Sequence, residues 1–116
     1  MLRIATIGTS MITDDFIQVV NANDQATFVG TLSRDADRGA AFTAEHGGER
    51  NFTALDELAS ADDVDAVYIG SPNALHYEQA LACIAGGKHV IVEKPFCATE
   101  AQALEVFRAA EAAGVV

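Results

Sequence analysis

The chain has 116 residues, 50% hydrophobic and 21% charged, a balance typical of one soluble globular domain rather than a disordered or fibrous chain. Its 17 acidic residues outnumber its 7 lysines and arginines, and the resulting net charge of −10 repels nucleic acid and anionic membranes at long range. A phosphate-bearing ligand therefore needs donors placed locally.

The cellular setting is expected to be a reducing cytoplasm. Cys83 and Cys97 have neither CxxC spacing nor a nearby histidine that would indicate a zinc site. The longest stretch without a charged residue, 66–77, contains a proline and a histidine, so no membrane span is expected. The first residues lack the pattern of a signal peptide.

Short apolar runs alternate with helical patterns along the whole chain. The predicted strands are 4–7, 27–32, 50–52, 66–69 and 89–92, and the predicted helices are 14–21, 36–46, 54–59, 74–85 and 99–113. Within the first helix, Phe16, Val19 and Val20 have helical spacing, and in the last helix Leu104 and Phe107 are expected to face inward.

Local signals refine these boundaries. Thr53 is expected to cap the helix at 54–59, and Thr99 with Gln102 to form a capping box. Gly114 is expected to end the last helix, after which Val115 and Val116 have the character of a sixth strand.

This alternation predicts an α/β fold with a doubly wound parallel sheet, the Rossmann fold, covered by helices on both sides. Right-handed crossovers make this topology the default. Ligands in such sheets bind beyond the carboxyl ends of the strands, which here are the loops at 8–11, 33–35, 70–73 and 93–96.

The first loop carries part of a dinucleotide fingerprint. Gly8 stands where the strand must turn sharply, whereas Ser10 and Thr13 occupy the places of the second and third glycines. Backbone N–H groups at Gly8 and Thr9, the Ser10 hydroxyl and the helix dipole could hold a pyrophosphate, although a plain tight turn explains the same residues. Met11 and Ile12 are predicted to line the site, with simple core packing an even alternative for Ile12.

The second loop bears on the choice of cofactor. An NAD site has an acid at the end of the second strand, but Ser33 and Arg34 stand there instead. A hydroxyl followed by a guanidinium suits a 2′-phosphate, so NADP is favoured over NAD. NAD remains an alternative because Asp35, an acid, follows directly. Alternatively, Arg34 is a solvated charge near Asp35 and Asp37.

Two further motifs resemble a known family. Glu93-Lys94-Pro95 follows a Val-Ile-Val strand, and Ser71-Pro72-Asn73 with His76 follows the strand at 66–69. In this arrangement the chain resembles the glucose–fructose oxidoreductase, inositol dehydrogenase and rhizopine-catabolism (Gfo/Idh/MocA) family along its whole length. The resemblance implies a nicotinamide cofactor, a sugar or polyol substrate, and a homo-oligomeric full-length protein.

The resemblance also implies a second domain, built on an open sheet, that would supply the acid/base histidine. Residues 1–116 are therefore expected to be a cofactor domain truncated before its substrate domain, and inactive alone.

Lys94 is the predicted catalytic residue. The end of the fifth strand directs it toward the crevice, where an ammonium group can hydrogen-bond the reacting oxygen or orient nicotinamide and substrate. Glu93 would hold the loop or contact the nicotinamide ribose, and the resemblance implies a cis bond before Pro95. The alternative is an exposed lysine in a turn.

Ser71, Pro72 and Asn73 are expected to pass beneath the cofactor, with Asn73 either capping a helix or bonding a ribose. His76 is placed with this cofactor-binding group, although a packed histidine is favoured over a catalytic one, and metal binding has little support.

Two other function classes remain open. A redox-inactive relative could sense a dinucleotide or a sugar nucleotide, although the presence of Lys94 argues mildly against it. A methyltransferase-like Rossmann domain would need an acid closing the second strand, which Ser33 and Arg34 disfavour.

Overall fold

The computed structural model describes residues 1–94 and 96–116, with the backbone alone at Asn73. The predicted alternation of strands and helices is present throughout. In chain order the elements are β1 (Leu2–Ile7), α1 (Met11–Asn21), β2 (Ala26–Leu32), α2 (Ala36–Glu45), β3 (Arg50–Phe52), α3 (Leu55–Ala59), β4 (Ala66–Ile69), a 3₁₀ turn η1 (Asn73–Leu75), α4 (His76–Ala85), β5 (His89–Val92) and α5 (Glu100–Ala113).

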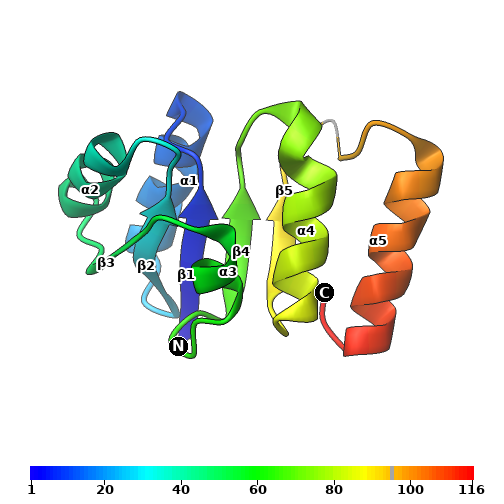
Figure 1. Ribbon diagram of the computed structural model, residues 1–116. Helices are drawn as coiled ribbons and strands as arrows, with labels where there is room; N and C mark the ends of the chain where they lie inside the picture. Colours follow the sequence, from blue (N-terminus) through cyan, green and yellow to red (C-terminus); the bar gives the residue numbers. More distant parts are fainter. Residues whose placement is uncertain (95) are drawn as a thin grey trace.

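The strands form one parallel sheet in the order β3-β2-β1-β4-β5, with β1 at the centre (Figure 1). The register aligns the last residues of four strands: Ile7 lies beside Leu32 and Ile69, and Ile69 lies beside Val92. The loops that follow these strands therefore leave from a single edge of the sheet. This arrangement confirms the predicted doubly wound fold.

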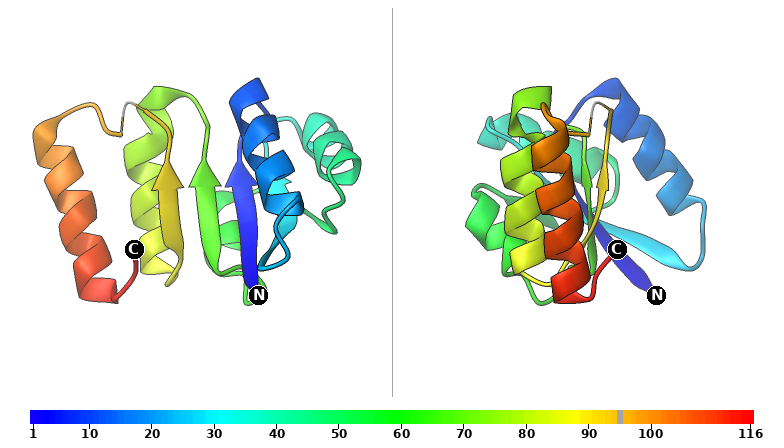
Figure 2. Two further views of the ribbon diagram at one scale, coloured as in Figure 1. Left: turned by 180° about the vertical axis from the view of Figure 1, so that it is seen from behind. Right: turned by 90° about the vertical axis from the view of Figure 1, so that its right-hand side faces the viewer.

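Helices cover the two faces separately. Figure 2 shows α1 on one face and α3, α4 and α5 on the other. On the α1 face, Ile17 of α1 and Phe42 of α2 pack with Ile4 and Phe28 of the strands. The opposite face has the larger cluster, in which Phe52, Leu58, Val67, Ile69, Ile84 and Val106 are buried. Burial on both sides explains the continuous apolar runs of the strands.

Helix α1 differs from its prediction. It begins at Met11, three residues before the predicted start at 14, because Ser10 caps it. Ile17 and Val20 are buried, whereas Val19 is 69% exposed. Because the helix starts earlier, its N-terminus directly follows the turn after β1.

The capping predictions have mixed outcomes. Thr99 caps α5 as predicted: its Oγ1 accepts from the Gln102 N–H at 3.1 Å. The Gln102 Oε1, which a capping box would direct to the Thr99 N–H, accepts instead from the Ala98 N–H at 3.2 Å. Gly114 ends the helix at a φ of +73°. Thr53 does not cap α3, because Ala54 holds the N-cap position without any side-chain bond. Helix α4 proper begins at His76 rather than 74, after the 3₁₀ turn.

The predicted inner face of α5 is wrong. Leu104 is 46% and Phe107 60% exposed, whereas Val106 is 2% exposed and faces the core. Beyond α5 the Val90 N–H donates to the Val116 carbonyl at 2.9 Å, but the sheet of the described residues has five strands, and the predicted sixth strand at 115–116 is not among them. Among the described helices, none has the length and apolar character needed to cross a bilayer.

Candidate dinucleotide and lysine site

The turn after β1 requires glycine for two reasons. Gly8 has a φ of +106°, a backbone conformation that residues other than glycine rarely adopt. A Cβ there would also lie 2.9 Å from the Gly70 carbonyl oxygen of the neighbouring strand end. The chain consequently passes directly from β1 to the N-terminus of α1, whose unpaired N–H groups and dipole favour an anion. The predicted tight turn is confirmed.

Ser10 and Thr13, which replace the other two glycines of the fingerprint, cap the helix together. The Ser10 Oγ accepts from the Thr13 N–H at 3.4 Å and lies 3.1 Å from the Thr13 Oγ1. Thr13 is fully buried because Gly70 makes room: a Cβ at Gly70 would lie 2.5 Å from the Thr13 Oγ1. In the complete fingerprint, a glycine on the helix lets the helix pack closely against the sheet. Here the helix carries Thr13 at that position, and the missing side chain of Gly70, after β4, provides the room.

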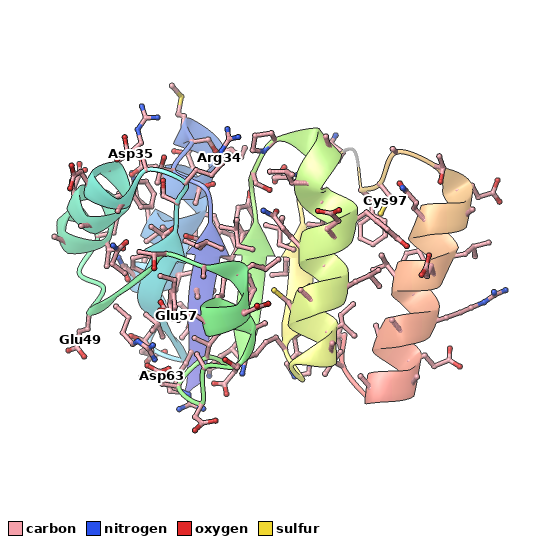
Figure 3. The ribbon with its side chains drawn as sticks, viewed as in Figure 1. Arg34, Asp35, Glu49, Glu57, Asp63 and Cys97 are labelled. Atoms are coloured by element: carbon pink, nitrogen blue, oxygen red, sulfur yellow. The ribbon has the colours of Figure 1, made fainter. Side chains whose placement is uncertain are left out.

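A cavity of about 590 Å³ opens beside this turn. Residues from four strand ends and from the starts of α1, α2, α3 and α4 line it. Of the predicted site residues, it gathers Gly8, Thr9, Ser10, Ser33, Arg34, Ser71 and Pro72. Figure 3 shows Arg34 at the edge where the strands end, with Glu49 and Asp63 toward the opposite end of the sheet.

Two arginines contribute positive charge to this cavity. Arg34 and Arg38 both line it, and no ion pair of the described residues engages either. Asp35, which kept an NAD site open, caps α2: its Oδ1 accepts from the N–H groups of Asp37 and Arg38 at 3.0 and 3.1 Å. That arrangement places the carboxylate at a helix N-terminus while leaving both guanidinium groups available.

Sequence reasoning missed several cavity residues. Arg38 lies in the first turn of α2, directly after the loop that carries Arg34, and this closeness in the chain could have indicated a second cation. The others had no local signal, because they come from separate elements that only the sheet brings together. They include Thr53, Leu55, Leu75 and Gln79.

The loop after β4 is held by side chains from α4. His76 is fully buried, and its Nε2 lies 2.9 Å from the Ser71 carbonyl, which can only accept. The Ser71 hydroxyl donates to the Gln79 Oε1. His76 therefore lies behind the loop and outside the cavity lining, as favoured for a packed histidine, while Ser71 and Pro72 face the cavity.

Glu93 and Lys94 lie at the end of β5, outside the cavity lining. Because β4 separates β5 from β1, the two loops are about 10 Å apart at the usual spacing between strands. The Glu93 N–H donates to the Ile69 carbonyl at 3.0 Å, and the Tyr68 hydroxyl donates to the Glu93 Oε2 at 2.6 Å. Lys94 is exposed.

Met11 and Ile12 do not line the cavity. They are 81% and 50% exposed at the start of α1, so the core-packing alternative for Ile12 is wrong.

The predicted roles of the Asn73 side chain and of Pro95 fall outside the described residues. Cys97 packs against the larger core. Burial raises the pKa of the Cys83 thiol to about 12 and also raises that of Cys97, so neither thiol resembles an activated nucleophile.

The model of an oxidoreductase family with an NAD-binding Rossmann fold, Gfo/Idh/MocA, matches residues 2–116. The chain belongs to this family. It is 44% identical over 116 residues to an NADP(+)-dependent scyllo-inositol 2-dehydrogenase of Bacillus subtilis and 41% identical over 116 residues to a 1,5-anhydro-D-fructose reductase of Ensifer adhaerens. These alignments cover 100% of the chain and 35% of each relative, so the Gfo/Idh/MocA chain spans about a third of their length.

Solved structures agree with this assignment. A 3-ketoreductase from Actinomadura kijaniata, solved with NADP, superposes with a TM-score of 0.93 at 33% identity, covering 99% of this chain and 36% of its own. GenD2 from gentamicin A biosynthesis, solved with NAD, superposes with the same TM-score at 30% identity, covering 99% of this chain and 33% of its own. Membership of Gfo/Idh/MocA excludes the methyltransferase-like alternative.

Proposed function

We propose that the natural protein containing this chain is an NAD(P)-dependent oxidoreductase acting on a hydroxyl or carbonyl group of a sugar, a polyol or a related small molecule. The carrying observation is the cavity that joins the Gly8 turn at the N-terminus of α1 to the arginines of the β2–α2 segment. The NADP(+)-dependent scyllo-inositol 2-dehydrogenase and the 3-ketoreductase solved with NADP support the choice of NADP over NAD.

The described residues fit a dinucleotide. Gly8 permits the sharp turn that places the N-terminus of α1 beside the cavity, the first turn of α1 offers N–H groups, and Arg34 with Arg38 would donate hydrogen bonds to the 2′-phosphate. When bound, the cofactor would supply hydride exchange at its nicotinamide ring. Lys94 would donate a hydrogen bond to the reacting oxygen and stabilise negative charge that develops there.

We propose that residues 1–116 are the cofactor domain of a longer, homo-oligomeric protein whose further domain supplies the substrate contacts and the acid/base group. The chain alone would then turn nothing over, and dehydrogenase activity from residues 1–116 would contradict this. A cytoplasmic setting fits the two free cysteines, and the net charge of −10 fits a small-molecule partner better than nucleic acid or a membrane.

The direct test titrates NADPH and NADH into the full-length protein and its Arg34→Ala variant. Because a hydrogen bond to a charged group is worth about 1.5–3 kcal/mol, the variant should lose about 10- to 100-fold in affinity for NADPH and little for NADH. Arg108→Ala, on exposed α5, is the matched control. Tighter binding of NADH by the wild type, with no loss in Arg34→Ala, would overturn the NADP assignment.

A further inference from the structure

Tyr68 carries a buried hydroxyl that the proposed chemistry does not use. It stands on β4, where the residue is 3% exposed, and its hydroxyl donates to the Glu93 Oε2 at 2.6 Å. Glu93 is the residue immediately before Lys94. A tyrosine buried within the sheet thus reaches the loop proposed to do the chemistry.

The tyrosine ring is held on two sides. It stacks on Phe16 of α1 with ring centroids 4.1 Å apart and an interplanar angle of 12°. On another side, a Cβ at Gly70 would lie 3.1 Å from the Tyr68 Cε1, so the glycine at the strand end leaves the ring little free space. The hydroxyl is therefore presented in one position, set by α1 and by the end of β4.

Glu93 is consequently bound through both its main chain and its side chain. Its N–H extends the β4–β5 ladder to the Ile69 carbonyl at 3.0 Å, and its carboxylate accepts from Tyr68. The adjacent Lys94 ammonium would be the natural partner for a carboxylate released from this bond. Among the described residues, however, no ion pair engages Lys94.

We propose that Tyr68 is a positioning residue that holds the Glu93 carboxylate against the sheet and so keeps it from pairing with Lys94. The inference rests on the proposed function, in which Lys94 must offer its ammonium hydrogens to the reacting oxygen. An ammonium paired with Glu93 would have fewer hydrogens to offer and less net charge with which to stabilise an oxyanion. The hydrogen bond from Tyr68 to Glu93 therefore keeps the Lys94 ammonium available, in addition to giving the buried Tyr68 hydroxyl a partner.

The test measures how fast an N-hydroxysuccinimide acetate reagent acylates Lys94 in the full-length protein, by peptide mass spectrometry. In Tyr68→Phe the ring and its stacking remain, but Glu93 is released to pair with Lys94. Since an exposed ion pair is worth about 0.2–1 kcal/mol, acylation of Lys94 should slow by up to about fivefold. Lys88, which is 7% exposed and donates to the Ala61 carbonyl, is the internal reference and should not change.

Two further variants separate positioning from general damage. Glu93→Gln in the Tyr68→Phe background removes the charge that captures Lys94, so acylation should return to the wild-type rate. Tyr77→Phe is the matched control, because it removes another hydroxyl bound to a glutamate, Glu105, on the α4–α5 surface, and should leave Lys94 unaffected.

An unchanged acylation rate in Tyr68→Phe, or a slowed rate that Glu93→Gln does not restore, would overturn the inference. NADPH binding is measured in parallel on the wild type. Its absence would count against the proposed function, whereas the acylation rates would still decide the role of Tyr68.

Discussion

The turn after β1 and the loop after β5 are held in place by different means. Gly8 is constrained by backbone conformation and by a carbonyl 2.9 Å from where its Cβ would be. Glu93 is held by one ladder bond and one side-chain bond from Tyr68, while Lys94 beside it stays exposed. The first region is rigid and offers mainly main-chain donors, whereas the second presents a charged side chain whose availability depends on a neighbour.

This difference fits what each region is proposed to contact. A pyrophosphate is held by several N–H groups at once, so its turn needs a fixed backbone. A reacting oxygen needs one donor aimed at a developing charge, so the lysine loop needs a free ammonium group. Substitutions in the turn after β1 should therefore reduce stability and dinucleotide binding, whereas substitution of Lys94 should reduce catalysis.

Gly8→Val should have the largest effect. Strain in the left-handed region costs about 1–3 kcal/mol and overpacking about 1–3 kcal/mol, so the free energy of unfolding should fall by about 2–6 kcal/mol and dinucleotide binding should be lost. Denaturant unfolding and NADPH titration measure the two effects. Gly47→Ala is the control, because Gly47 has a φ of +80° and no atom within 4 Å of an added Cβ. Wild-type binding by Gly8→Val would show that the turn is not part of the site.

Lys94→Ala in the full-length protein should separate binding from catalysis. Removing a donor to a developing oxyanion typically costs about 10²- to 10³-fold in kcat. The dissociation constant for NADPH should change little, because Lys94 lies outside the cavity that is proposed to bind the pyrophosphate and the 2′-phosphate. Steady-state kinetics with a sugar or polyol that the protein turns over, together with NADPH titration, test this. An unchanged kcat would leave Lys94 as an ordinary exposed lysine.

Arg38→Ala tests whether the second arginine shares the 2′-phosphate. Affinity for NADPH should fall by about tenfold or more, as for one charge-assisted hydrogen bond, while affinity for NADH should stay constant. The effect should add to that of Arg34→Ala only in part, since both arginines would contact one group. Equal losses for NADPH and NADH would place Arg38 at another part of the dinucleotide.

The smallest effect is expected at the opposite end of the sheet. Asp65 accepts from the Arg3 side chain at 2.8 and 3.0 Å, and this pairing lowers its pKa from 3.8 to about 2. Because the folded pKa is depressed, the pairing stabilises the fold above pH 4 and is lost as the pH falls toward 2. Since the pair is partly exposed, Asp65→Asn should cost less than about 1 kcal/mol at pH 7. Urea unfolding of the wild type and of Asp65→Asn at pH 7 and pH 3 measures the change in the free energy of unfolding. Weaker NADPH binding by Asp65→Asn would contradict the prediction that Asp65 is remote from the cofactor site.

Much of the fold could be predicted because its signals are local. The apolar runs of β1 and β4 are buried on both faces, so their sequence alone indicates parallel strands. Thr99 and Gly114 delimit α5 through bonds and dihedral angles of their own segment. The predictions failed where burial depends on a neighbour, as at Phe107, which stays 60% exposed although its helical spacing suggested an inner face.

The sequence by itself determined the order of the elements, the glycine turn after β1 and the lysine loop after β5, because each depends on residues within a few positions of one another. Only the tertiary structure decided what those parts meet. Gly70 makes room for Thr13, the cavity brings Arg34 together with Ser71, and Tyr68 of β4 reaches Glu93 at the end of the neighbouring strand β5. These contacts join residues far apart in the chain, and parallel pairing of the strands is what brings them to one edge.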